Sequence, residues 1–210
     1  MSYGFLDIAV TPRVQAVQTG MGADRIWQDF KGDRAFDRFG ENEAAFIADR
    51  DSFYIATVSE TGWPYVQHRG GPRGFLQLLD ERTLAFADYR GNRQYISTGN
   101  LAADGRACLF LMDYARRTRL KIYAEVETLA IEADPALTER VTIPGYRAKI
   151  ERIFQLRLAA FDWNCQQHIT PRFAEQEVIE AIRPLHDRVA QLETENAALR
   201  ARLAGSGDTP

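Results

Sequence analysis

The chain has 210 residues, of which 45% are hydrophobic and 26% charged, and its formal net charge is −3. This is ordinary globular composition, and the length favours one domain with extensions over two full domains. No basic excess indicates a nucleic acid or an acidic membrane as partner, and no apolar run approaches the ~20 residues of a membrane span. The N-terminus lacks a basic region followed by an apolar stretch, so we expect a cytoplasmic protein.

Residues 1–42 are expected to form an N-terminal helical extension. The stretch TPRVQAVQTGMGADRIWQDF predicts a helix after Thr11, with Pro12 in its first turn, where proline is tolerated. GENEAAFIADRD (40–51) predicts a second, short helix.

The middle of the chain is rich in strand patterns. Residues 52–58 and 64–69 flank the Gly-containing SETGW, which has hairpin length, and residues 119–132 alternate between apolar and polar side chains. Further strand candidates are 74–79, 82–87 and the apolar run 106–112. Residues 149–161 fit a helical face and a strand face equally well, so periodicity leaves that segment open. These patterns predict a small barrel of five or six strands with one helical insertion.

The insertion, FADYRGNRQYISTGNL (86–101), collects polar groups after a strand. Gly91 is expected to adopt positive φ, and Asn92 to cap a helix that ends near Leu101. Free N–H groups at such a turn bind phosphate, and Arg93 adds a bidentate fork, with Ser97 one turn further on. The alternative is an exposed turn in which Asp88 pairs with Arg90 or Arg93.

Two other strand ends are equally polar. VQHRGGPRGF places Gln67, His68 and Arg69 before a glycine pair, and DYARRTRLKIY places Arg119 beyond an arginine-rich hairpin tip. Each has a structural interpretation by itself, as a capped strand end or a solvated hairpin. Three such ends on one small barrel indicate a binding site.

The C-terminal segment, 174–204, carries a heptad pattern. Ile182, Val189, Asn196 and Leu203 occupy position a, and Leu185, Leu192 and Leu199 occupy position d. This pattern is typical of a coiled coil, and an asparagine at a favours a parallel pair in register. The alternative is an amphipathic helix packed on its own domain. Residues 205–210 are expected to be a disordered tail.

Three stretches together carry a resemblance to a known family: YIATVSETGWPYVQHRGGPRGFL, TLAFADYRGNRQYISTGNL and RACLFLMDYARRTRLKIYAEVE. They resemble the FMN-binding split barrel of the pyridoxamine 5'-phosphate oxidase-like family, and FDWNCQQHITPRF resembles a signature (DWNCxQHITPR) of one uncharacterised branch. The resemblance implies a mainly β (α+β) fold, a six-stranded antiparallel split β-barrel over 43–173 with flanking helices and the C-terminal coiled coil. It also implies that 149–161 is a strand and that the protein is a homodimer with FMN at the subunit interface.

The resemblance assigns roles to particular residues. Gln67, His68 and Arg69 would meet the flavin edge and ribityl chain, and Arg119 would approach the ring. Three further residues would close the pocket, from the other subunit: Trp163, Gln167 and His168. The phosphate turn would comprise Asp88, Asn92, Arg93 and Gln94, with Ser97 beside it.

The sequence departs from the family's oxidase, which has lysine where this chain has Gln94 and about where it has Gln77. RPLHDR (183–188) mimics that enzyme's Arg-x-His substrate motif, but it lies on the heptad seam, so we do not expect vitamin B6 oxidation. Cys165 and His168 are the right distance apart for half a metal site, but no second pair exists, and we expect no metal.

The resemblance and the three polar strand ends predict an FMN-dependent oxidoreductase. Electrons would pass from a nicotinamide donor through the flavin to a small acceptor or oxygen. No catalytic acid or base stands out. The alternatives are a non-catalytic flavin-, deazaflavin- or haem-binding module that stores or senses, and a dimeric scaffold.

Overall fold

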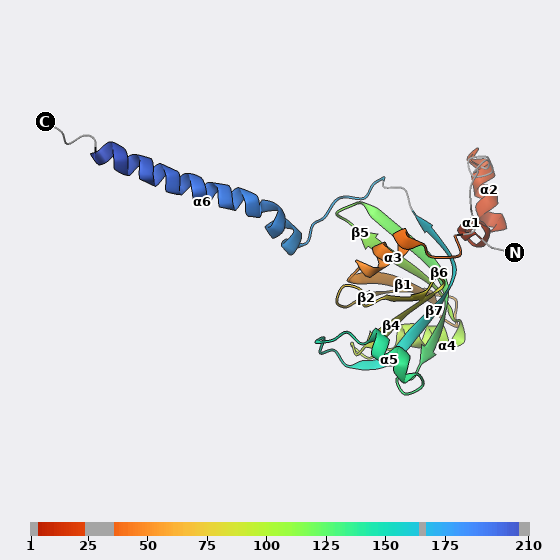
Figure 1. Cartoon of the computed structure of the whole chain (residues 1–210). Coiled ribbons are helices and arrows are strands. Elements are labelled where there is room, and N and C mark those ends of the chain that lie inside the picture. The colour runs from red at the N-terminus through yellow and green to blue at the C-terminus, as the bar shows by residue number, and fades with distance from the viewer. Residues whose placement is uncertain (1–3, 24–35, 164–166, 206–210) are drawn as a thin grey trace. The chain divides into compact units, whose positions relative to one another are not determined.

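The computed structural model describes residues 4–23, 36–163 and 167–205, and it divides into two compact units, Met1–Ile169 and Thr170–Pro210 (Figure 1). Every strand of the described residues lies in the first unit, and the described part of the second unit holds one long helix. No helix of the described residues has both the length and the apolar character needed to cross a membrane. The domain limits given above, at 42/43 and 173/174, stay predictions.

In the described part of the chain before the sheet there are three helices: α1 (Phe5–Ala9), α2 (Pro12–Gly20) and α3 (Glu41–Ala48). α2 begins as predicted, because Val14 N–H donates to Thr11 Oγ1 at 3.4 Å and Pro12 occupies the first turn. The remainder of that predicted helix, from residue 24 onward, lies outside the described residues. The predicted helix within 40–51 is confirmed as α3.

The barrel unit is one antiparallel sheet with the strand order β2-β1-β5-β6-β7-β4-β3. The strands are β1 (Ser52–Val58), β2 (Pro64–Gly70), β3 (Gln77–Asp80), β4 (Thr83–Tyr89), β5 (Arg106–Asp113), β6 (Thr118–Leu129) and β7 (Ile150–Trp163). The mainly β fold is confirmed, with seven strands in the described residues where six were expected.

The seventh strand is β7, which forms from the segment 149–161, where periodicity did not distinguish a helix from a strand. β7 is 14 residues long and pairs with both β6 and β4. Its residues Phe154, Leu156 and Leu158 are buried on one face, which is the period of a strand. A register shift between Tyr123 and Ala124 bends the β6–β7 pair, as bulges do.

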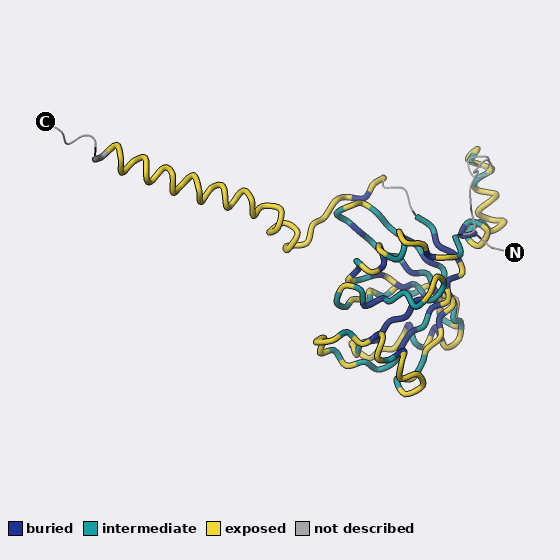
Figure 2. The backbone as a smooth tube through the Cα atoms, in the orientation of Figure 1, coloured by how far each residue is buried: buried dark blue, intermediate teal, exposed yellow. Residues whose placement is uncertain are grey.

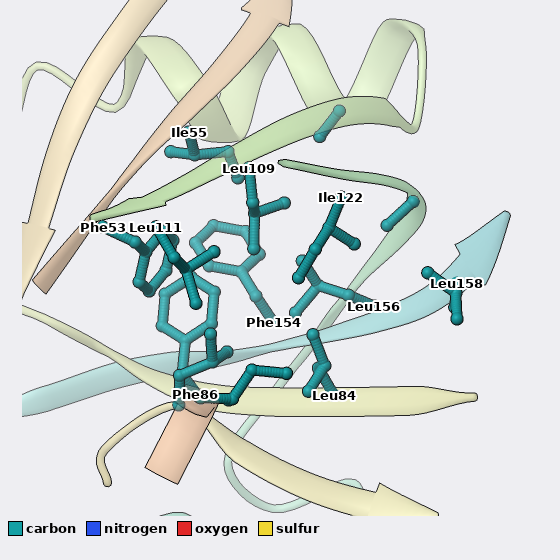
Figure 3. Packing of buried hydrophobic residues seen from close by; sticks show 14 of the residues in the cluster. Phe53, Ile55, Leu84, Phe86, Leu109, Leu111, Ile122, Phe154, Leu156 and Leu158 are labelled. Carbon is teal, nitrogen blue, oxygen red and sulfur yellow. The ribbon is translucent and has the colours of Figure 1, made fainter. Parts of the chain in front are cut away.

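Aromatic and branched side chains from several strands fill the barrel (Figure 3). Phe53 meets Phe86 edge to face with ring centroids 5.2 Å apart, and Phe86 lies 5.3 Å from Phe154. Leu109 and Ile122 complete the same core (Figure 3). Because these rings come from β1, β4 and β7, the sheet must curl around them, as a split barrel does.

Among the described residues, two helices lie between strands where one insertion was expected. α4 (Ile96–Ala103) is fixed to the barrel by Asn100 Nδ2, which donates to Thr57 Oγ1 at 3.0 Å. α5 (Pro135–Val141) was not predicted. The residues that begin this helix are nevertheless adjacent in the sequence. Asp134 accepts a hydrogen bond from Leu137 N–H at 2.9 Å, and Pro135 occupies the first turn.

The second unit is helix α6 (Glu175–Gly205), which includes Pro184. Every side chain of residues 175–203 is exposed, and Figure 2 shows this part of α6 in the colour of exposed residues. The predicted helix is therefore confirmed, whereas its pairing as a coiled coil stays a prediction.

Candidate functional site

A cavity of about 250 Å³ opens where β2 and β4 end and the turn 90–95 begins. Six residues predicted from the sequence line it: Gln67, His68, Arg69, Asp88, Asn92 and Arg93. Two of the three polar strand ends therefore meet in one place.

Asp88 is the buried centre of this site. Its carboxylate accepts a short hydrogen bond from Arg69 Nη1 and another from Arg152 Nη1 at 3.2 Å. Arg69 lies on the first strand of the sheet order and Asp88 on the sixth, so this ion pair spans the opening of the curled sheet. Burial raises the pKa of Asp88 even though both guanidiniums act to lower it. Asp88 thus orients two arginines and does not pair with Arg90 or Arg93, as the exposed-turn alternative had it.

A second carboxylate connects the turn to β7. Glu151 Oε1 accepts from Arg90 Nε at 2.7 Å and from Tyr95 Oη at 3.3 Å, and the Arg90 hydrogen bond lowers the pKa of Glu151. Four guanidiniums and two carboxylates lie around the cavity, which leaves a formal excess of two positive charges. The guanidiniums are those of Arg69, Arg90, Arg93 and Arg152, and the carboxylates are those of Asp88 and Glu151. That excess matches the charge of a phosphate monoester at neutral pH.

The backbone of the turn differs from its prediction. Gly91 does not have positive φ; the left-handed residues are Arg93 (φ 63°) and Tyr95 (φ 52°). Non-glycine residues in this region carry strain and occur preferentially at functional sites. Asn92 does not cap the helix, because α4 begins after Tyr95 without a side-chain cap. Asn92 Oδ1 instead accepts from Gln94 N–H at 3.2 Å within the turn.

Ser97 and Gln94 lie beside the cavity without lining it. Ser97 is buried, and its hydroxyl donates to Gln67 Oε1 at 2.8 Å, so it positions Gln67 from α4. The Gln94 side chain accepts from Asn92 Nδ2 at 3.2 Å.

Two donors at the cavity have no hydrogen-bond partner in the part of the chain that the structure describes. They are Arg69 Nε and Tyr89 Oη, and both atoms are buried. Burial raises the pKa of Tyr89, so its hydroxyl keeps its proton and can donate. An unsatisfied buried donor costs about 1–3 kcal/mol, which a bound acceptor oxygen would remove.

The remaining predicted residues lie elsewhere in this chain. Arg119 is on the outer face of β6 with its Cζ 5.8 Å from the Phe110 ring centroid, and its Nε is also buried without a partner among the described residues. Trp163 donates from Nε1 to Glu43 Oε1 at 2.7 Å. Gln167 and His168 are exposed. None of the four lines the cavity.

Arg152 and Glu151 are the functional candidates that the sequence did not indicate. Arg152 lies directly opposite Asp88 in the β4–β7 register, 64 positions along the chain. Only a strand-pairing prediction could have brought the two together.

Cys165, which together with His168 would form half of a metal site, lies outside the described residues. Part of the DWNCxQHITPR signature lies outside them too. Across residues 4–23, 36–163 and 167–205, no three His, Cys, Asp or Glu side chains gather closely enough to hold a metal ion.

The family model for pyridoxamine 5'-phosphate oxidase matches residues 39–158, which is more than half of the chain. The chain belongs to the pyridoxamine 5'-phosphate oxidase family. The matched segment contains the whole cavity, from Gln67 to Glu151. No curated protein matches the sequence.

Several solved structures are similar to this family member. An FMN-binding protein from Syntrophomonas wolfei is 14% identical, covers 70% of this chain and is itself covered to 97%, with a TM-score of 0.47. A Clostridium acetobutylicum protein related to general stress protein 26, of the pyridoxinephosphate oxidase family, is 14% identical over 65% of this chain and 94% of its own (TM-score 0.46). HupZ from Group A Streptococcus is 14% identical over 64% of this chain and 99% of its own (TM-score 0.46).

Proposed function

We propose that the protein is an FMN-dependent oxidoreductase whose cofactor phosphate binds in the cavity at the turn 90–95. The observation that carries this proposal is the pair of buried, unpartnered donors, Arg69 Nε and Tyr89 Oη, in a cavity with excess positive charge. A phosphate or ribityl oxygen is an acceptor that both atoms could use.

The turn supports the phosphate end of the ligand. The exposed Arg93 has a planar fork that suits two phosphate oxygens. The first-turn N–H groups of α4 have no side-chain cap, so they are free to receive an anion. Asp88 and Glu151 hold Arg69, Arg152 and Arg90 in place, which reduces the entropy lost when the ligand binds.

Bound FMN would supply the redox chemistry, with a nicotinamide as electron donor and a small molecule or oxygen as acceptor. The residues of this chain would bind and orient the flavin. Gln67 and His68, at the end of β2, would lie along its ring edge, and a guanidinium near the ring would favour its reduced, anionic form. Glutamine at position 94, in place of the family's lysine, leaves one cation fewer for a second phosphorylated ligand, so vitamin B6 oxidation is not proposed.

We further propose that a second copy completes the site. A cavity of about 250 Å³ is below the roughly 300–1,000 Å³ of ordinary ligand sites. The outer face of β2, β1 and β5 is apolar and open, with Val66 59% and Tyr54 40% exposed beside Ala56 and Phe110 in the strand register. Pairing two such faces would cover them, and it would give Arg119 Nε an acceptor on the other copy.

The test is an absorption spectrum of the purified protein, then titration with FMN and anaerobic addition of NADH or NADPH. We expect a flavin spectrum, FMN binding, and loss of the oxidised-flavin band with one of the two donors. Protein that stays colourless after incubation with FMN would contradict the proposal.

One observation favours a binding module without turnover. Asp88 and Glu151, the two carboxylates of the cavity, are both hydrogen-bonded to arginines, so neither is free to move a proton. Bound flavin that no nicotinamide reduces would support a storage or sensing role, and a Soret band would indicate haem. A cytoplasmic location stays a prediction.

Val66→Glu is expected to weaken FMN binding at least about tenfold, because pairing would bury an unpaired carboxylate. Flavin fluorescence titration measures this. Val17→Glu is the matched control, since Val17 on α2 is 66% exposed and lies outside the proposed pairing face. Equal affinities in the two variants would exclude this face as the one that completes the site.

A further inference from the structure

Helix α6 presents an apolar stripe that nothing in its own unit covers. Ile182, Leu185, Val189, Leu192 and Leu199 are between 38% and 64% exposed. A 31-residue helix in water gains most of its stability from burying such a stripe, so a partner surface is expected. The residues beside the stripe show which partner fits.

In the heptad, positions e and g flank the seam. Arg188 and Glu195 occupy g, and Glu193 and Arg200 occupy e. When two helices pair in parallel and in register, each g residue faces the e residue of the next heptad on the other helix. Arg188 would then face the partner's Glu193, and Glu195 would face the partner's Arg200. Two-fold symmetry repeats both contacts, so four flanking pairs are all attractive.

An antiparallel pair of the same helices has fewer attractive contacts. In that arrangement g faces g and e faces e, and the alignment that pairs residue 182 with the partner's residue 199 keeps the apolar layers of the stripe. It places Arg188 against the partner's Glu195 and Glu193 against the partner's His186. Symmetry repeats the Arg188–Glu195 contact, so this alignment has two Arg–Glu pairs where the parallel pair has four.

Asn196 also favours the parallel orientation, for a reason that does not involve charge. At position a, it would face the partner's Asn196 in a parallel pair, where the two amides can hydrogen-bond. In the antiparallel alignment it would face the partner's Leu185, and a buried amide without a partner is costly.

From these contacts we infer that residues 182–199 of α6 bind the same segment of a second copy as a parallel, in-register, two-stranded coiled coil. The partner that covers the apolar stripe is thus a second copy of this chain, and charge complementarity and Asn196 both favour it. Holding two chains together raises the effective concentration of their first units toward each other. The inference does not depend on flavin binding.

Cross-linking of full-length Asn196→Cys tests the register. Two cysteines facing each other at position a are within disulfide distance in a parallel pair, so mild oxidation is expected to yield mostly linked dimers. Thr194→Cys, at the outward position f, is the matched control, and the unmodified chain controls for Cys108 and Cys165. Linkage no greater in Asn196→Cys than in Thr194→Cys would overturn the inference.

Charge reversal tests the orientation. Arg188→Glu and Glu193→Arg each make two flanking contacts repulsive in a parallel homodimer, whereas a mixed pair of the two variants restores both. With Asn196→Cys in both chains, we expect roughly a fivefold or greater excess of mixed over same-variant disulfides. An antiparallel pair would place position 196 opposite the partner's Leu185, so the two cysteines would be too far apart for a disulfide in any of these variants. Statistical mixing, or stronger self-pairing of Arg188→Glu, would overturn the parallel arrangement. Flavin content, measured on the same samples, reports separately on the proposed function.

Discussion

Replacing Arg69 by methionine is expected to lower the free energy of unfolding by about 3 kcal/mol. Removing one partner of a buried ion pair costs roughly 3–5 kcal/mol, because the remaining charge stays buried. Only 14% of the Arg69 side chain and 6% of the Asp88 side chain are exposed, and the retained Arg152 contact places the loss at the lower end of that range. Urea unfolding at neutral pH measures the change.

The loss of unfolding free energy in Arg69→Met should also depend on pH. Burial already raises the pKa of Asp88, and removing Arg69 would raise it further. When the pKa of a carboxyl group is higher in the folded state than in the unfolded state, the protonated group favours folding at low pH. This contribution to stability is lost as the pH rises through the folded-state pKa, where the buried group must become charged. The stability difference between Arg69→Met and the unmodified chain should therefore shrink as the pH is lowered into the acid range. A difference that stays constant would mean that Asp88 is not the charge left behind.

Arg73→Met is the matched control for this variant. Arg73 is also paired with an aspartate, Asp49, but 61% of its side chain is exposed. Exposed pairs contribute about 0.2–1 kcal/mol. Equal losses from the two substitutions would show that the Arg69–Asp88 pair does not hold the opening of the barrel together.

Arg93→Ala is expected to weaken FMN binding by about 1.5–3 kcal/mol, which is roughly 10- to 150-fold in Kd. This is the range for a hydrogen bond to a charged group, and the Arg93 guanidinium is exposed at the cavity, with Nε 3.4 Å from Tyr95 Oη. Arg93→Lys should lie between, since lysine keeps the charge but cannot form the fork. Quenching of flavin fluorescence on titration gives all three affinities.

Arg13→Ala controls for the general loss of one positive charge, because Arg13 is exposed on α2. Its FMN affinity should match that of the unmodified chain. If Arg93→Ala also leaves the affinity unchanged, the phosphate does not bind at this turn, and the flavin proposal must rest on another part of the cavity.

The strand segments were predictable because their signals are local. The alternation along 119–132 and the hairpin length of SETGW recur in β6 and in the β1–β2 connection. The turn 90–95 was predicted less well. Glycine was expected to take the left-handed conformation, but Arg93 and Tyr95 take it. Arg93 Nε donates to Tyr95 Oη, and Tyr95 Oη donates to Glu151 on β7. Tertiary contacts there outweigh the local preference.

The candidate site shows the same division. Polar groups at the ends of β2 and β4 were visible in the sequence, and six of them line one cavity. Their partners were not visible: Arg152 reaches Asp88 across the β4–β7 pair, and Ser97 reaches Gln67 from α4.

The sequence by itself determined most of the strands and helices, where polar side chains follow strands, and the heptad pattern of α6, but not α5 and, by periodicity alone, not β7. Those properties depend on residues a few positions apart. Only the tertiary structure decided that Arg69 and Arg152 share the carboxylate of Asp88 and that Arg119 lies away from the cavity. Such contacts join residues many positions apart, so they depend on the order of the strands and on the curl of the sheet, which no local pattern specifies.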